Sequence, residues 1–214
     1  MISLTLLAAL PALASAHGLV SSPAFTRQPG AATAAVCGTT MVKFYQADGT
    51  SYPEALMRAN PNGLHDGYDS TKCNLHLCKG FQFGDVPAAN VQTYAAGTEV
   101  AMEVKVRIAH TGYANVSVVD TGRNAVIGEM LKVWESGYAA STTLPGDQGK
   151  FSVKVPELGG RCVEAGACVL QWHWWGQGQT YQSCIDFVQP VAEAAAPGGG
   201  HAGHKRGIRG GRRN

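Results

Sequence analysis

The sequence has few charged side chains, few helical segments and no long hydrophobic run. Only 15% of its 214 residues are Asp, Glu, Lys or Arg. Apart from a short apolar run at 2–10, no segment approaches the length that spans a bilayer, so we expect no membrane-embedded domain. The Asp and Glu residues are scattered without a persuasive close pair, which argues against the two-carboxylate chemistry of glycoside hydrolases.

The net charge of +2 is unevenly distributed along the chain. Residues after Gln189 carry five basic side chains against Glu193 alone, so this segment contributes +4 and residues 1–189 contribute −2. The positive total is therefore no evidence for nucleic-acid binding by the main domain. Segment 190–214 is rich in Ala, Gly and Arg with little to bury, and it is predicted to be a disordered basic tail.

The first 16 residues have the composition of a secretory signal peptide. The apolar run is followed by Pro11 and then by Ala14-Ser15-Ala16, the kind of small residues that signal peptidase accepts before its cut. This pattern predicts cleavage before His17 and a secreted, extracellular protein. The mature chain would contain one domain over residues 17–189, which is long enough for a full core.

Six cysteines in a secreted chain most simply form three disulfides. Cys73 and Cys78 are close enough for a local loop, and so are Cys162 and Cys168. Those pairs would leave Cys37 to bond with Cys184, tying the N-terminal part to the last strand. Spacing alone does not choose among the possible pairings.

Strand patterns dominate residues 17–189. In segment 99–109 apolar residues alternate with polar ones, which is typical of a half-buried strand. Shorter strands are predicted at 116–119, 151–155, 169–175 and 185–188, with Gly and Pro clusters between them, and one short helix is predicted at 53–60. We expect an all-β fold, an antiparallel β-sandwich of the immunoglobulin or fibronectin-III type, whose long connections, such as 30–90, are functional loops.

His17 is the first candidate metal ligand. After cleavage it would offer two nitrogens, its α-amine and its imidazole, whose reference pKa values of about 7.7–8 and about 6.5 allow both to lose a proton near neutral pH. His110 follows the long alternating strand, where Gly112 permits a turn. Gln179 and Tyr181 share strand parity, so both side chains can project to one face.

Together, His17-Gly18, His110 and the Gln179-x-Tyr181-x-x-Cys184 motif resemble the fungal lytic polysaccharide monooxygenases. Segments 27–30 (Arg-Gln-Pro-Gly) and 52–60 (Tyr-Pro-Glu-Ala-Leu-Met-Arg-Ala-Asn) are most similar to auxiliary-activity family 16. The resemblance implies one copper ion, Cu(II)/Cu(I), bound by the amine and ring of His17 and the ring of His110, with Tyr181 at an axial position. Imidazole and amine nitrogens suit copper. By the same resemblance, Gln179 would donate a hydrogen bond toward bound oxygen, and His173 is a further candidate beside it.

The resemblance also implies an activity. The protein would be an oxidoreductase that cleaves glycosidic bonds of a polysaccharide, with cellulose and C1 oxidation indicated, using O2 or H2O2 and an external electron donor. We expect a monomer without nucleic-acid or membrane partners. Two alternatives stay open: a secreted histidine-brace copper-binding protein without oxygenase activity, which usually has a carboxylate where Tyr181 stands here, and a carbohydrate-binding module with an incidental terminal histidine.

Other motifs are less specific. Asn115-Val116-Ser117 matches the N-glycosylation sequon, so the protein is a candidate glycoprotein. His65, Tyr52 and Tyr68 belong to the long early connection and would either contribute to a flat sugar-binding face or serve as ordinary loop residues. Trp172, Trp174 and Trp175 are interpreted as packing residues.

Overall fold

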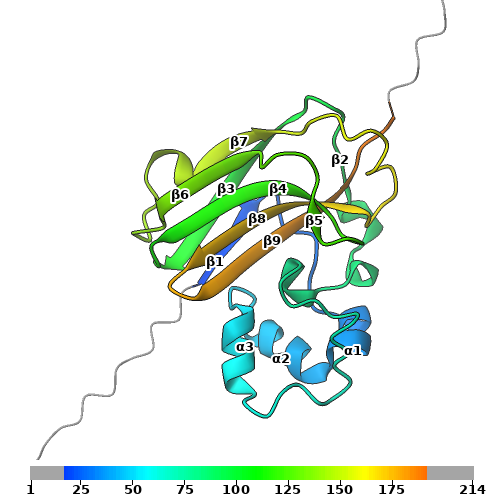
Figure 1. Cartoon of the computed structure of the whole chain (residues 1–214), viewed down its shortest axis with the longest axis vertical. Coiled ribbons are helices and arrows are strands. Elements are labelled where there is room, and N and C mark those ends of the chain that lie inside the picture. The colour runs from blue at the N-terminus through cyan, green and yellow to red at the C-terminus, as the bar shows by residue number, and fades with distance from the viewer. Residues whose placement is uncertain (1–16, 192–214) are drawn as a thin grey trace, which may run out of the picture.

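Two β-sheets stacked face to face form the body of the protein (Figure 1). The computed structural model describes residues 17–191. In the smaller sheet the strand order is β1-β3-β7, and in the larger sheet it is β2-β9-β8-β4, with β5 and β6 both pairing with β4. All pairings are antiparallel except that of β2 with β9. The predicted antiparallel β-sandwich is therefore confirmed. The strands are β1 His17–Ser22, β2 Gln92–Thr93, β3 Glu99–Ile108, β4 Gly112–Asp120, β5 Ala125–Val126, β6 Lys132–Tyr138, β7 Lys150–Lys154, β8 Cys168–Gly176 and β9 Gln179–Val188.

The main core lies between the sheets. The alternation predicted for 99–109 is confirmed in β3, whose Val100, Met102, Val104 and Val106 are buried while the residues between them are mostly exposed. Trp172 and Trp174 of β8 are fully buried in the same core. These bulky side chains fill the space between the two layers, as a close-packed interior requires.

The segment 30–90 is more structured than the sequence pattern indicates. It contains the predicted helix as α3, two further α-helices and three 3-10 turns, and the α-helices lie together below the sandwich in the view of Figure 1. A second small core, which includes Met41, Tyr45, Leu56 and Phe81, holds them together. The helices are α1 Ala31–Cys37, α2 Thr39–Ala47 and α3 Pro53–Ala59, and the 3-10 turns are η1 Cys78–Gly80, η2 Phe83–Asp85, η3 Ala88–Asn90 and η4 Gly146–Gln148, the last of which precedes β7.

A distant carboxylate caps the first of these helices. Asp85 of η2 accepts hydrogen bonds from the backbone N–H groups of Gly30, Ala32 and Thr33, at 3.1, 2.8 and 2.7 Å. A capping carboxylate satisfies donors that have no partner within the helix. Because Asp85 is far from α1 in sequence, no local pattern could predict this helix start.

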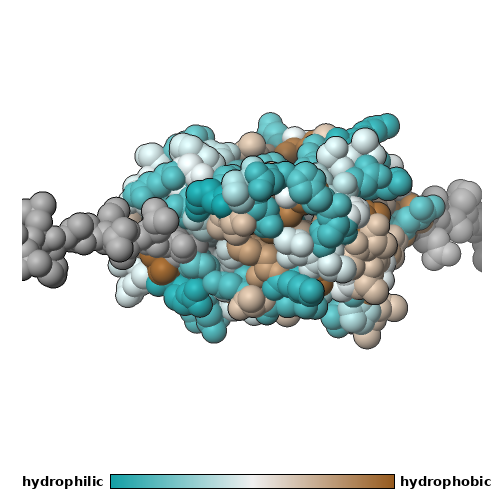
Figure 2. Space-filling model, turned by 90° about the horizontal axis from the view of Figure 1, so that it is seen from below, coloured by the Kyte–Doolittle hydropathy of each residue, from teal (hydrophilic) through white to brown (hydrophobic). Residues whose placement is uncertain are grey.

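From below, the molecule presents mostly polar residues, with hydrophobic ones in small separate patches (Figure 2).

Two of the three predicted disulfides are wrong. Cys162–Cys168 is confirmed, but Cys37 bonds with Cys73 and Cys78 with Cys184. The end of α1 lies beside Cys73, with Cα atoms 5.2 Å apart, whereas Cys78 begins η1, which packs on β9. The pairing thus follows the docking of the helices on the sandwich, which sequence spacing does not reveal.

A buried ion pair fastens the segment after β1 to β9. The guanidinium of Arg27 donates from Nε and Nη2 to the carboxylate of Asp186, which is fully buried, and the Thr26 hydroxyl donates to the same carboxylate at 2.5 Å. Paired oxygens and nitrogens of this kind offset the cost of burying charge. Together with the Cys78–Cys184 disulfide, this contact holds β9 against the segments that precede the sandwich's later strands.

Two sequence predictions, the signal peptide (1–16) and nearly all of the basic tail (192–214), concern residues outside the described range. Within 17–191, no helix is long and apolar enough to cross a membrane. Asn115 of the sequon is buried in β4, and its amide nitrogen lies 3.3 Å from the Tyr113 hydroxyl.

Candidate metal centre

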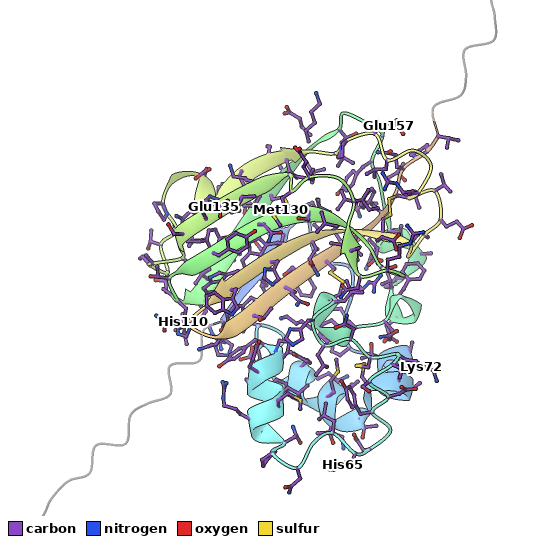
Figure 3. All side chains as sticks on the ribbon, viewed as in Figure 1. His65, Lys72, His110, Met130, Glu135 and Glu157 are labelled. Carbon is purple, nitrogen blue, oxygen red and sulfur yellow. A yellow bond between two sulfur atoms is a disulfide. The ribbon has the colours of Figure 1, made fainter. Side chains whose placement is uncertain are left out.

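The two histidines predicted as metal ligands come to the same end of the sandwich. His17 opens β1 and pairs with Ile108 at the end of β3, and His110 follows two residues later. Figure 3 shows His110 at the end of the sheets where the chain enters β1. Both residues are buried, with 6% and 5% of their surface exposed. The antiparallel pairing of β1 with β3 therefore brings together two residues that are far apart in sequence.

Trp174 is the common neighbour of the residues at this end. Its indole Nε1 donates a hydrogen bond to the carbonyl of His110 at 3.2 Å. The Tyr181 ring stacks on it, with ring centroids 4.4 Å apart and an interplanar angle of 27°. A Cβ on Gly18 would come within 3.0 Å of the indole, so glycine beside His17 allows β1 to approach closely. The indole thus fixes β1, His110 and β9 relative to one another.

Gln179 and Tyr181 meet as their strand parity predicts. The Tyr181 hydroxyl donates to Oε1 of Gln179 at 2.5 Å. Tyr181 is fully buried, and Tyr52 packs on it with ring centroids 5.1 Å apart. Burial, followed by the neighbouring Tyr52 and Glu54, raises the pKa of Tyr181 well above its usual value. The phenol is therefore neutral at physiological pH.

Asp48 holds the ring of His17 from the helical side. Its Oδ2 lies 2.8 Å from His17 Nε2 and 3.0 Å from an Arg107 nitrogen. Although burial raises the pKa of the Asp48 carboxyl, hydrogen bonds from Thr50 and the charges of His17 and Arg107 outweigh it and leave the pKa below its ordinary value. The carboxylate is therefore ionised beside the candidate ligand. Sequence reasoning missed it, because Asp48-Gly49 reads as an ordinary turn.

The long connection 30–90 also contacts β9, on the other side of the site. Glu54, in the first turn of α3, accepts hydrogen bonds from the Thr180 backbone N–H and hydroxyl at 3.1 and 2.8 Å. Tyr52, just before this helix, packs on Tyr181 and accepts a hydrogen bond from Arg58. Residues 48–54 thus contact His17 of β1 and both Thr180 and Tyr181 of β9.

His173 is not brought to this group. It neighbours Trp174 in β8, whose ring faces the core, so His173 projects from the opposite face of the strand. There it pairs with Asn115 on one side and Gln182 on the other. Burial, together with the charge of His76, lowers its pKa. The structure therefore separates His173 from Tyr181 and Gln179.

The early aromatic residues divide in a similar way. Tyr52 is buried and belongs to the site, whereas the Tyr68 hydroxyl donates to the Cys73 carbonyl and His65 is exposed. Of the three tryptophans in β8, Trp172 and Trp174 are core residues as interpreted, and Trp175 is half exposed.

The donor set suits a nitrogen-binding metal. Two imidazoles and a phenol lie at one end of the sandwich, and imidazole is a good ligand for copper and its neighbours in the periodic table. Among residues 17–191, no three His, Cys, Asp or Glu side chains form a metal-binding group. The fold and site together define a β-sandwich protein with a candidate metal centre at one end of its sheets.

Some solved structures are similar to this chain at low sequence identity. No protein-family model matches the sequence, and no curated protein does either. Similar solved structures include a chitin-binding domain from Burkholderia pseudomallei (13% identity, TM-score 0.42, covering 82% of this chain and 100% of that one). Others are a cellulose-active lytic polysaccharide monooxygenase in complex with copper (15%, 0.42, 80% and 98%) and one of class AA15 from Thermobia domestica in the Cu(I) state (15%, 0.40, 81% and 98%). At these values the comparisons assign no chemistry to this chain.

Proposed function

We propose that this chain is a secreted copper-dependent lytic polysaccharide monooxygenase that acts on cellulose with oxidation at C1. The observations that support the proposal are two: His17 pairs with Ile108, two residues before His110, and Trp174 contacts both the His110 carbonyl and the Tyr181 ring. Cleavage before His17 would add an α-amine to this group. The resulting three nitrogens and one phenol match the donors that the sequence resemblance implies.

Each residue has a definable task in this proposal. His17 and His110 would hold copper, which supplies the redox chemistry that lets O2 or H2O2 oxidise a carbon of the glycosidic linkage. Tyr181, buried and neutral, would close the protein side of the centre without adding negative charge. Its hydroxyl orients the Gln179 amide, whose NH2 group would be left to donate a hydrogen bond to the oxygen co-substrate. An external donor would supply the electrons.

The free amine gives the sharpest test of this proposal. Protein that begins at His17 is expected to bind Cu(II) tightly and, with a reductant and cellulose, to release aldonic oligosaccharides detectable by mass spectrometry. A matched protein with one alanine before His17 should bind copper on the order of 100-fold more weakly or worse, since even loss of an outer partner of a ligand costs about 10–100-fold. Equal copper affinity in the two proteins, measured by calorimetry, would rule out the amine as a ligand.

The Asp48 carboxylate beside His17 favours a second candidate, a copper-binding protein without oxygenase activity. The two candidates differ in their products and not in their copper affinity. Tight copper binding combined with no oxidised sugar from cellulose, chitin or xylan would favour the second candidate. Oxidised products that disappear when the alanine is added before His17 would favour the first.

A further inference from the structure

The Asp48 side chain is held from two sides at the end of α2. Its Oδ1 accepts hydrogen bonds from the backbone N–H and the hydroxyl of Thr50, the first at 3.0 Å. Its Oδ2 faces His17 Nε2 at 2.8 Å and the Arg107 guanidinium at 3.0 Å. Because both oxygens are engaged, the carboxylate has a fixed direction relative to β1 and β3.

The contact with Nε2 has a consequence for the rest of the His17 ring. When a carboxylate accepts a hydrogen bond from one imidazole nitrogen, the proton of the neutral ring stays on that nitrogen and the lone pair is on the other. In His17 the other nitrogen is Nδ1, which is the one close enough to the α-amine of the same residue to close a small chelate ring with it. Nε2 points away from the backbone and cannot do so.

We propose that Asp48 is the positioning residue of the candidate metal centre, which fixes the Nε2–H tautomer of His17 and so directs Nδ1, together with the α-amine, toward the metal. The inference rests on the proposed function. Asp48 does not itself touch the metal or the substrate. A residue at the end of α2 would thus decide which ring nitrogen of His17, a residue of the sandwich, faces the metal.

The test uses Asp48→Asn and a matched control, Asp69→Asn. Asp69 makes the same contacts to the residue two positions later, accepting from the Thr71 N–H at 3.0 Å and from its hydroxyl, and it pairs with Lys72 instead of a histidine. Nitrogen NMR of metal-free mature protein reports the His17 tautomer, and calorimetry and electron paramagnetic resonance report Cu(II) binding and geometry.

We expect the Nε2–H tautomer in the wild type and in Asp69→Asn, and a mixture of tautomers in Asp48→Asn. We also expect Asp48→Asn to bind Cu(II) about 10–100-fold more weakly with an altered resonance spectrum, and the control to match the wild type. An unchanged tautomer in Asp48→Asn would overturn the proposal, and so would a changed tautomer with unchanged copper binding. A wild type that shows the tautomer and binds no copper would instead overturn the proposed function.

Discussion

Tyr181 serves two purposes that a single substitution can separate. Its ring packs between Trp174 and Tyr52, and its hydroxyl meets Gln179. The ring contributes to the core between the sheets, whereas the hydroxyl belongs to the candidate metal centre. Removing the hydroxyl alone is therefore informative about function, and removing the ring is informative about folding.

Tyr181→Phe is expected to fold normally and to lose about 1 kcal/mol of unfolding free energy, the net value of one hydrogen bond. Tyr181→Ala should lose about 3–5 kcal/mol, because it leaves a cavity beside Trp174. Denaturant titration measures both. In the phenylalanine variant we expect copper to bind with a changed resonance spectrum and product yield to fall. An unaltered spectrum would show that the hydroxyl does not face the metal.

At the scale of elements, glycines decide how closely the strands approach one another. A Cβ on Gly176, at the end of β8, would lie 2.5 Å from the carbonyl oxygen of His110. That oxygen also accepts the Trp174 hydrogen bond. The position of His110 therefore depends on the absence of a side chain in a neighbouring strand.

Gly176→Ala is expected to displace His110 and to weaken Cu(II) binding on the order of tenfold or more. This is the lower end of the loss in metal affinity that follows when the residues around a ligand are changed. Gly122→Ala is the control, because its nearest neighbour would be 3.5 Å away. Calorimetric titration of copper into both variants gives the comparison. Equal affinities would mean that His110 contributes little to the centre.

The cap on α1 gives the helical segment a pH dependence. Although burial raises the pKa of the Asp85 carboxyl, hydrogen bonds from Thr33, Ala32 and Gly30 outweigh it and lower the pKa below the reference value of 3.8. The folded pKa is therefore below the unfolded one, so this stabilisation is complete above about pH 4 and is lost as the pH falls through the folded value. Asp85→Asn should be less stable than the wild type at pH 6, with a smaller difference at pH 2, in thermal melts followed by circular dichroism.

Sequence patterns predicted the helices and strands that are determined by the residues within them. The alternation in 99–109 identified β3, and Pro53 and the residues after it identified α3. β1 and β6 were missed, because β1 has only two large apolar residues, Leu19 and Val20, and β6 has mostly exposed, mixed residues. The pairings of Cys37 and Cys78 and the contact of Asp48 with His17 depend on how the helices dock, which no local pattern contains.

At the scale of the molecule, the contacts on β9 join the helical segment to the sandwich. The Arg27–Asp186 ion pair is the most buried of them, with 7% and 0% of the two side chains exposed. Arg27 also donates to the Phe81 carbonyl, so the pair links three parts of the chain. Removing one partner would leave the other charge buried and unpaired.

Asp186→Asn is therefore expected to lower the unfolding free energy by about 3–5 kcal/mol. Glu103→Gln, which breaks the exposed Glu103–Lys150 pair, should leave the unfolding free energy almost unchanged. Denaturant titration at neutral pH compares the two variants. Similar losses in both would mean that the Arg27 contact stabilises the fold no more than a surface pair does.

The described chain enters the sandwich at His17 and leaves it at Val191, at the opposite end of the sheets (Figure 1). The two ends are therefore not equivalent for protein engineering. An affinity tag or a fused carbohydrate-binding module attached after Val191 would leave the candidate centre accessible, whereas any tag left before His17 would occupy the position of a proposed ligand. Recombinant material for every copper experiment above should carry its tag at the carboxyl end and be released with His17 first.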